Sequence, residues 1–314
     1  MSGLFNIHYI PQQEIDLTKW DHCINHAPNG LIYGYSYYLN HMAKQWDALV
    51  LSKGLPSEND YEAVMPLTWN KKYSILYLYQ PFLTAQLGVF GHNISAEMLE
   101  AFLQAIPAKF SYWDFYLNYH NAFEPKSFPL YQRKNFVLYL DKPYDELYSN
   151  YRPNTQRNIR KAEKLGCKPI NDFAVQKVIN LAVAQMKNYT TESSANVERF
   201  TKLYHHLYKQ QQAITYGVLS AKNEIVASCI FIFSHNRAYY ILVGNHTDSR
   251  NAGASHFLID AFIKDHAGKR MLLDFEGSDM TNLAHFYQSF GAHEENYSAI
   301  KMNKLPFYLK WMKK

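Results

Sequence analysis

The sequence predicts an α/β fold with mixed central sheets flanked by helices, built in two similar halves. The first observation is a buried strand at residues 271–275, followed by a polar turn and an amphipathic helix that stops at Gly291. The second is a series of three strand-like segments at residues 214–243, joined by tight turns, which leads through a helix into that strand. Period-two strands that alternate with helical segments are typical of this fold class.

Length and composition bound the number of domains. The chain has 314 residues, of which 47% are hydrophobic and 19% are charged. This length suits two domains of about 150 residues each, and the hydrophobic content is enough to bury a core in both. We expect the domains to span residues 1–140 and 141–314.

Charge and cysteine usage argue against several classes of protein. The formal net charge of +5 favours an anionic ligand slightly and is too small to indicate a DNA-binding protein. Cys23, Cys167 and Cys229 are far apart and lack C-x-x-C spacing, so neither a disulfide framework nor a zinc site is expected. Signal-peptide features and long apolar stretches are missing, so we expect a cytoplasmic protein without an integral membrane segment.

The first half alternates strands with one clear helix. Ser95 is a plausible N-cap for a helix at residues 95–106, whose apolar side chains share one face. Short apolar runs bounded by turn residues predict the strands of this half. These strands are expected at residues 46–52, 61–69, 74–79, 113–117 and 135–140.

The second half has a more regular order. A helical segment at residues 144–165 is broken at Pro153, because proline cannot continue a helix from the preceding turn. Further helices are expected at residues 175–187, 197–209 and 254–265. The strands are expected at residues 214–220, 226–234, 238–243 and 272–275.

The segment MLLDFEGSDMTNLAHFYQSFGA at residues 271–292 carries the most information. Its Ala284, Phe286, Tyr287 and Gly291 resemble the A-x-[LF]-Y-x-x-x-G element of the GNAT N-acyltransferase superfamily. The preceding D-F-x-G-S resembles the same place in Fem-type peptidoglycan aminoacyltransferases and their GNAT-like relatives. The resemblance covers nearly the full chain and implies two tandem GNAT-like folds, with a degenerate first domain and the donor site in the second.

The resemblance implies transfer of an acyl or aminoacyl group from a thioester or ester donor to an amine. An acyl-CoA co-substrate is favoured by a small margin, with a small-molecule or cell-wall-precursor amine as acceptor. An aminoacyl-tRNA donor is possible but not favoured, because no heptad pattern of coiled-coil length is present. The competing hypothesis is a degenerate transferase that only binds a ligand.

A candidate phosphate-binding segment precedes the helix at residues 254–265. It resembles the [QR]-x-x-G-x-[GA] loop that holds the coenzyme A pyrophosphate: Arg250 and Gly253 fit, Ala254 is at an unspecified position, and Ser255 replaces the usual Gly or Ala. Gly253, Ala254 and Ser255 are candidates for cofactor binding together with Arg250. Glycine lets backbone N–H groups approach phosphates, and a helix N-terminus favours an anion. The alternative is an ordinary structural turn. The oxyanion of the transfer reaction is expected at a backbone N–H near Val243 or Gly244.

A basic helix is predicted between the two halves. It resembles the family's R-x-x-I-[RK]-[RK]-A-x-[RK]-x-G run, and Ile159, Ala162 and Leu165 form a thin apolar face. Rows of guanidinium and ammonium groups suit phosphate binding, but a solvated basic face is an equal alternative. The candidate anion-binding residues are Arg152, Arg157, Arg160, Lys161 and Lys164.

Three residues are candidates for catalysis. Asp274 and Glu276 lie on one face of a strand that continues to residue 276, where a carboxylate can accept a proton from an attacking amine. Tyr287 is a candidate to protonate or orient the leaving group. The alternatives are structural: a carboxylate that caps the next turn, as for Asp279, and a tyrosine that only packs. The 14 histidines complete no recognisable metal set, so no metal is expected.

Overall fold

The computed structural model describes residues 5–186, 194–247, 249–277, 279–307 and 310, and they form two compact units. The first unit comprises Met1–Arg133 and Asn296–Lys314, and the second comprises Lys134–Glu295. These units differ from the expected spans 1–140 and 141–314, because the chain returns to the first unit at its C-terminal end. There β15 (Tyr297–Asn303) joins the first sheet, with Ile300 opposite Phe115.

The first unit contains an eight-stranded mixed sheet in the order β1-β2-β3-β4-β6-β15-β7, with β5 paired to β3. β4 and β6 run parallel, and the other pairs of the sheet are antiparallel. Besides β15, the strands are β1 (Ile7–Ile10), β2 (Gln45–Leu51), β3 (Ala63–Lys72), β4 (Ile75–Tyr79), β5 (Phe90–Gly91), β6 (Phe110–Tyr116) and β7 (Leu130–Arg133).

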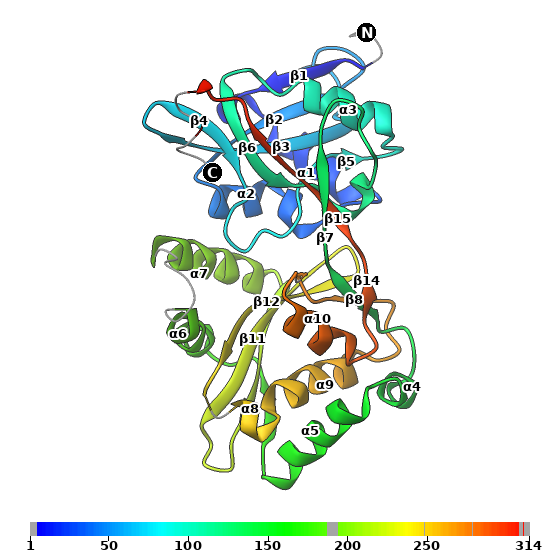
Figure 1. Ribbon diagram of the computed structural model, residues 1–314, viewed down its shortest axis with the longest axis vertical. Helices are drawn as coiled ribbons and strands as arrows, with labels where there is room; N and C mark the ends of the chain where they lie inside the picture. Colours follow the sequence, from blue (N-terminus) through cyan, green and yellow to red (C-terminus); the bar gives the residue numbers. More distant parts are fainter. Residues whose placement is uncertain (1–4, 187–193, 248, 278, 308–309, 311–314) are drawn as a thin grey trace. The chain divides into compact units, whose positions relative to one another are not determined.

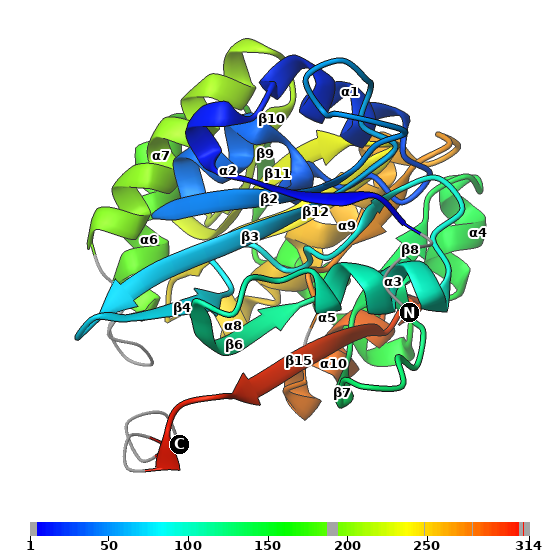
Figure 2. The same ribbon diagram turned by 90° about the horizontal axis from the view of Figure 1, so that it is seen from above.

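Helices cover both faces of this sheet (Figure 2). α1 (Leu17–His26) and α2 (Ser36–Met42) lie on one face, and α3 (Ala96–Gln104) lies on the other. The Ser95 hydroxyl accepts a hydrogen bond from the Met98 N–H at 3.2 Å, which confirms the predicted N-cap. Three-residue 3₁₀ turns complete the unit, at Gln12–Glu14, Ile32–Gly34 and Tyr119–Asn121.

The second unit contains a seven-stranded mixed sheet in the order β14-β8-β13-β12-β11-β10-β9. Only the β12–β13 pair of this sheet is parallel. The strands are β8 (Phe136–Tyr139), β9 (Lys168–Asn171), β10 (Ala213–Leu219), β11 (Ile225–Ser234), β12 (Arg237–Asn245), β13 (Leu272–Asp274) and β14 (His293–Glu294).

One expected strand changes domain in the structure. The segment 135–140 was expected to close the first half, but β8 pairs antiparallel with β13, with Val137 opposite Asp274. Its fully buried Phe136 packs in the core of the second unit. The edge strands β9 and β14 have few buried residues, and no strand was predicted at either segment.

Helices also cover both faces of the second sheet (Figure 1). One core joins alternate residues of β11, namely Ala227, Cys229 and Phe231, to the helices α4, α5, α9 and α10. The opposite face of the sheet receives α6 and α7. The helices are α4 (Tyr144–Ser149), α5 (Pro153–Lys164), α6 (Val175–Met186), α7 (Ser194–Lys209), α8 (Ser249–Ala252), α9 (Ala254–His266) and α10 (Thr281–Gln288).

Helix boundaries follow the predicted signals. Pro153 is the first residue of α5, where its missing N–H costs nothing, so the predicted break at this proline is confirmed. Gly166 ends the segment with φ 73°, a left-handed conformation that favours glycine. The helix that was expected to end at Gly291 ends at Gln288, and Gly291 follows with φ 84°.

Candidate functional site

The two parallel strands of the second sheet separate part-way along their length. β12 pairs with β13 only from Arg237 opposite Leu272 to Tyr239 opposite Asp274. β13 then ends, whereas β12 continues to Asn245. Beyond Tyr239, β12 has no strand partner on this side among the described residues. We call this place, where the β12–β13 pairing stops, the opening between the two strands.

A β-bulge lies on β12 beside this opening. The register passes from Ile241 opposite Ile230 to Gly244 opposite Ser228, so Leu242 and Val243 both face one residue of β11. Leu242 adopts φ 47°, which is strained for a branched side chain. Bulges and strained backbone concentrate at functional sites, where they redirect backbone groups. The two candidate oxyanion residues, Val243 and Gly244, thus lie at this irregularity.

Residue 244 must be a glycine because helix α6 approaches the backbone there too closely for a side chain. A Cβ atom at this position would lie 2.6 Å from the Ala182 nitrogen and 2.7 Å from the Leu181 Cβ. The Gly244 carbonyl accepts a hydrogen bond from the Ser228 hydroxyl at 3.0 Å. These contacts hold the C-terminal part of β12 in place, whatever the role of its N–H groups.

Asp274 is bound on both carboxylate oxygens. Its Oδ2 atom lies 2.5 Å from Nη1 of Arg237, and its Oδ1 atom accepts a hydrogen bond from the Glu276 N–H at 2.9 Å. Arg237 also binds Glu295 with distances of 2.8 and 3.0 Å. Asp274 and Arg237 are buried, so this ion-pair cluster fixes the end of β13 next to β12. The contacts fit the structural alternative for Asp274.

Tyr287 lies inside the second unit, close to both candidate carboxylates. Its ring stacks on Phe275 at a centroid distance of 4.6 Å and meets Tyr240 edge-on at 6.5 Å. Burial raises the pKa of its hydroxyl well above the usual range, and the Glu276 and Asp274 carboxylates raise it further. The hydroxyl is therefore protonated at neutral pH, and among the described residues it has no hydrogen-bond partner.

Glu276 follows β13 in an unusual backbone conformation. Its φ is 65°, and its side chain is half-buried in the connection between β13 and α10. Asp279 in the same connection accepts a hydrogen bond from the Lys134 N–H at 3.0 Å, which anchors the turn. The strand was expected to continue to residue 276, but β13 ends at Asp274 and Glu276 has a left-handed φ, so this part of the prediction is wrong. Asp274 and Glu276 lie close enough to Tyr287 to affect its pKa, and the catalytic roles of the three residues stay a prediction.

The candidate phosphate segment is more helical than expected. Residues 249–252 form α8, and Gly253 (φ 73°) separates α8 from α9. A Cβ atom at Gly253 would lie 2.4 Å from the Asn158 carbonyl oxygen of α5, so glycine is required here for packing as well as for conformation. Arg250 belongs to α8, but its side chain lies outside the described part of the structure.

The N-terminus of α9 lies at the C-terminal end of β12. The Ser255 hydroxyl donates a hydrogen bond to Asn245 Oδ1 at 3.1 Å, and Ala254 is fully buried. Ser255 therefore joins helix to strand, and Gly253 occupies the N-cap position without a side-chain bond. A 13-residue helix that begins beside the opening provides N–H groups and a dipole that favour an anion.

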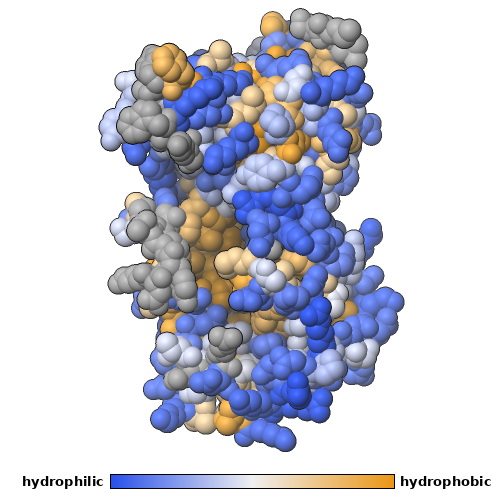
Figure 3. Space-filling view, viewed as in Figure 1, coloured by the Kyte–Doolittle hydropathy of each residue, from blue (hydrophilic) through white to orange (hydrophobic). Residues whose placement is uncertain are grey.

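The basic helix α5 exposes its cations. Thr155, Ile159 and Ala162 are buried beneath it, and α5 packs against α9 and α8. The surface over α5 is hydrophilic in Figure 3. Among the described residues no acidic side chain forms a salt bridge with the five cations. Those exposed side chains are Arg152, Arg157, Arg160, Lys161 and Lys164.

Comparison with known proteins agrees with this geometry. The family model for the acetyltransferase (GNAT) domain matches residues 149–281, which include α5, the β12–β13 opening and the start of α10. The second unit contains a GNAT domain. The antiparallel strands β10–β12, helix α9 and strand β13 all lie within the matched residues. No sequence among the curated proteins matches the chain.

Solved structures share the fold over nearly the whole chain. FemX is 14% identical, with a TM-score of 0.63 over 95% of this chain and 98% of that one. The tandem GNAT protein from the clavulanic acid biosynthesis pathway is 11% identical, with a TM-score of 0.54 over 96% and 99%. The C-terminal domain of a putative lysylphosphatidylglycerol synthetase from Agrobacterium fabrum is 8% identical, with a TM-score of 0.56 over 95% and 94%. The prediction of tandem GNAT-like folds with mixed sheets is confirmed.

Two features are absent from the described residues. No group of three or more His, Cys, Asp or Glu side chains in this part of the chain is arranged to hold a metal ion. No helix in it is both long and apolar enough to cross a membrane.

Sequence reasoning missed two parts of the GNAT domain site. Arg237 and Glu295 bind each other across 58 residues of chain, and no local pattern marks such a pair. The bulge at Leu242 lies in an apolar run, YYILVGN, that reads as a regular strand. The glycine at residue 244 was the only available signal, because an isolated glycine in a strand often marks a bulge.

Proposed function

We propose that the GNAT domain is an N-acyltransferase that moves an acyl or aminoacyl group from a thioester or ester donor to an amine. The observation that carries this proposal is the opening between β12 and β13, with the bulge at Leu242 on one side and Tyr287 on the other. Backbone N–H groups at a strained bulge suit a developing oxyanion, and a protonated tyrosine suits a leaving group.

The chemistry assigns one role to each group. The amine nitrogen bonds to the donor's carbonyl carbon, and the oxyanion that forms accepts hydrogen bonds from an N–H of Val243 or Gly244. Glu276 takes the proton that the amine releases, because both oxygens of Asp274 are already bound. As the bond from carbon to the leaving sulfur or oxygen breaks, Tyr287 protonates that atom. The proton on Glu276 then restores the neighbouring Tyr287.

Asp274 acts in this proposal as a positioning residue. Its contact with Arg237 fixes the end of β13, and its contact with the Glu276 N–H sets the conformation of the next residue. A carboxylate that holds two fixed donors orients the candidate base without exchanging a proton.

We favour a coenzyme A thioester as donor. The N-terminus of α9 begins beside the opening, and α5, which carries the exposed cations, approaches Gly253 through the Asn158 carbonyl. Phosphates of the donor would lie at this helix terminus, as anions do in general. The residues that would hold them are the N–H groups of Gly253, Ala254 and Ser255, with Arg250 and the α5 cations.

An aminoacyl-tRNA donor is the second candidate. The exposed cations of α5 suit a phosphate backbone, and the fold likeness to FemX and to a putative lysylphosphatidylglycerol synthetase points in the same direction. The acceptor is a primary amine on a small molecule or a cell-wall precursor in either case.

The test is a transfer assay on the full chain. Acetyl-CoA, and separately an aminoacyl-tRNA, is incubated with a panel of primary amines, and new amides are detected by mass spectrometry. Calorimetric titration with acetyl-CoA and coenzyme A at low and moderate salt accompanies the assay. Saturable, salt-weakened binding with amide formation supports the proposal. Binding without transfer to any amine supports the non-catalytic alternative instead.

A further inference from the structure

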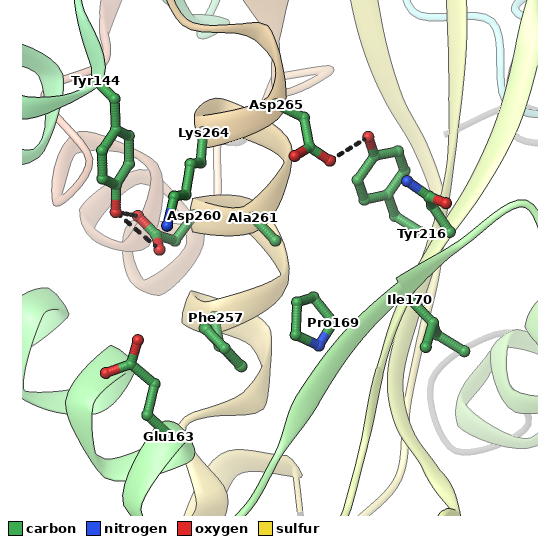
Figure 4. A pocket seen from close by; sticks show the side chains of 11 residues that line it. Tyr144, Glu163, Pro169, Ile170, Tyr216, Phe257, Asp260, Ala261, Lys264 and Asp265 are labelled. Atoms are coloured by element: carbon green, nitrogen blue, oxygen red, sulfur yellow. Dashed lines mark hydrogen bonds between the residues drawn. The ribbon is translucent and has the colours of Figure 1, made fainter.

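A second pocket lies on the helical face of the GNAT domain, away from the β12–β13 opening. Its volume is about 440 Å³, which is within the range of small-molecule sites. α9 forms one wall, and α4, α5, β9 and β10 contribute the others (Figure 4). β9 is the edge strand, separated from β12 by two strands, which is roughly 14 Å across the sheet. The pocket shares helix α9 with the proposed transfer site, but none of its lining residues is among those assigned to that site.

The pocket has an excess of negative charge. Its charged lining residues are Glu163, Asp260, Asp265 and Lys264, so three carboxylates face one ammonium group. Lys264 points toward Asp260 and Tyr144 in Figure 4, and its Nζ atom lies 5.4 Å from the Tyr144 ring centroid. An ammonium group is thus already accommodated against this wall, and the lining keeps a formal charge of −2 when all four groups are ionised.

The deepest carboxylate is Asp260, which is 4% exposed. The Tyr144 hydroxyl donates to its two oxygens at 2.9 and 3.2 Å. The buried Tyr151 hydroxyl also lies beside Asp260 and lowers the pKa of its carboxyl, but no hydrogen bond of ordinary geometry joins the two groups. Burying a carboxylate and a hydroxyl without full hydrogen bonding costs free energy of folding, and a bound polar or charged group would reduce that cost.

The other walls suit an aliphatic chain. Pro169, Ile170, Phe257 and Ala261 are apolar, and the rings of Tyr144 and Tyr216 provide aromatic surface. The Tyr216 hydroxyl donates to Asp265 Oδ2 at 2.8 Å, which holds a second carboxylate at the opposite end of the lining (Figure 4). Aromatic faces attract organic cations, and apolar walls accept the methylene groups between two charges.

We propose that this pocket binds a small linear diamine as a dication, with one ammonium group at Asp260 and the other at Asp265. Two ammonium groups balance the residual charge of the lining, and the carbon chain between them lies against the apolar wall. The site is independent of the transfer reaction, because its residues lie outside the proposed donor site.

Protonation of Asp260 competes with the ligand. The pKa of this carboxyl is raised to about 6, chiefly by burial and also by the nearby Glu163 carboxylate, against the opposing effect of the Tyr144 and Tyr151 hydroxyls and Lys264. A bound cation favours the ionised carboxylate. Affinity for the diamine is therefore expected to fall as the pH decreases through about 6.

The experiment is calorimetric titration of the full chain with 1,4-diaminobutane, with 1,4-butanediol as the uncharged control. We expect saturable binding of the diamine and none of the diol. Asp260→Asn is expected to weaken binding at least about tenfold and to remove its pH dependence. Glu163→Gln tests the same site at an exposed position where folding is not at risk, with an expected loss of about threefold. Asp145→Asn is the matched control, an exposed carboxylate of α4 outside the lining, and should bind as wild type does.

Three results overturn the proposal. The first is the absence of saturable binding at diamine concentrations up to about 10 mM, which would show that the pocket has no specific affinity for a diamine. The second is equal affinity in wild type and in both Asp260→Asn and Glu163→Gln. The third is a loss of affinity in Asp145→Asn as large as in Glu163→Gln, which would indicate general charge screening.

Discussion

Arg237 and Asp274 form a buried ion pair of 2.5 Å at the point where β12 and β13 separate. Arg237 begins β12 and Asp274 ends β13, so the pair joins the two strands on one side of the opening. Glu295 completes the cluster from the segment that follows β14. The site thus depends on a charge cluster that takes no part in the proposed chemistry.

Removing the cation of this cluster is expected to destabilise the second unit strongly. Arg237→Leu leaves the buried Asp274 and the half-buried Glu295 without their shared cation, at a cost of about 3–5 kcal/mol. Urea denaturation measures the loss. Lys134→Ala is the control, because it removes an exposed pair with Glu294 at 3.2 Å and should cost less than about 1 kcal/mol. Equal costs for the two variants would contradict a structural role for Arg237.

Gly253 and Gly268 form a matched pair for testing the contact between α5 and α9. Both have left-handed φ, 73° and 78°, but a Cβ atom at Gly268 meets nothing within 4 Å. Gly268→Ala should therefore cost only the backbone strain, about 1 kcal/mol. Gly253→Ala adds a clash with the Asn158 carbonyl and should cost at least about 2 kcal/mol more in thermal or urea unfolding. Similar costs would show that α5 does not approach α9 at this point.

Tyr287→Phe separates the chemical role of this tyrosine from its packing. The ring contacts with Phe275 and Tyr240 are kept, so unfolding free energy should change by less than about 1 kcal/mol. The rate of amide formation should fall about a hundredfold, because the leaving group loses its proton donor. Tyr204→Phe on α7 also removes a buried hydroxyl and should leave the rate unchanged. An unchanged rate in Tyr287→Phe would leave this tyrosine only a packing role.

The cations of α5 are expected to affect donor binding and not stability. Arg157 and Arg160 are exposed, and their side-chain bonds within the helix are long, at 3.5 and 3.3 Å. Replacing both with Gln should weaken coenzyme A binding about tenfold at low salt, and less at high salt. Lys222→Gln, on the exposed turn after β10, is the control. If the double variant binds coenzyme A as wild type does, α5 is a solvated face.

Asp260 makes the free energy of unfolding decrease as the pH rises, which is opposite to the usual effect of an aspartate. Its folded pKa of about 6 is higher than the ordinary value of 3.8, so the folded state holds a proton that the unfolded state releases. Stability from this group is therefore present below pH 4 and lost as the pH rises through 6. Between pH 4 and pH 6, the free energy of unfolding of wild type should fall by on the order of 2 kcal/mol relative to that of Asp260→Asn. Unfolding curves at several pH values measure the difference, and a flat difference would contradict the raised pKa.

Local signals predicted much of the fold. Ser95 marked the start of α3, and Pro153 marked the break between α4 and α5. The strand β8 was placed in the wrong half, because its partner β13 lies more than a hundred residues away and only pairing reveals its sheet. The sequence predicts a loop before the helix at residues 254–265, whereas residues 249–252 form α8 and Gly253 separates two helices.

The sequence names candidate site residues, and their part in catalysis stays a prediction. Asp274, Glu276 and Tyr287 come together because strand, turn and helix are consecutive in sequence. The role of Asp274 depends on Arg237, which binds it from the neighbouring strand β12. No local sequence pattern predicts that contact. Long-range ion pairs and bulges follow from sheet register, which hydrophobic periodicity alone does not determine.

The most direct test of the account is amide hydrogen exchange on the full chain, with and without saturating coenzyme A. The account predicts slower exchange at residues 242–245 of β12 and at 253–256 at the start of α9, with little change in the first unit's sheet. Such protection would place the donor at the opening between β12 and β13. Coenzyme A binding that protects other segments and leaves both of these unchanged would contradict the proposed site.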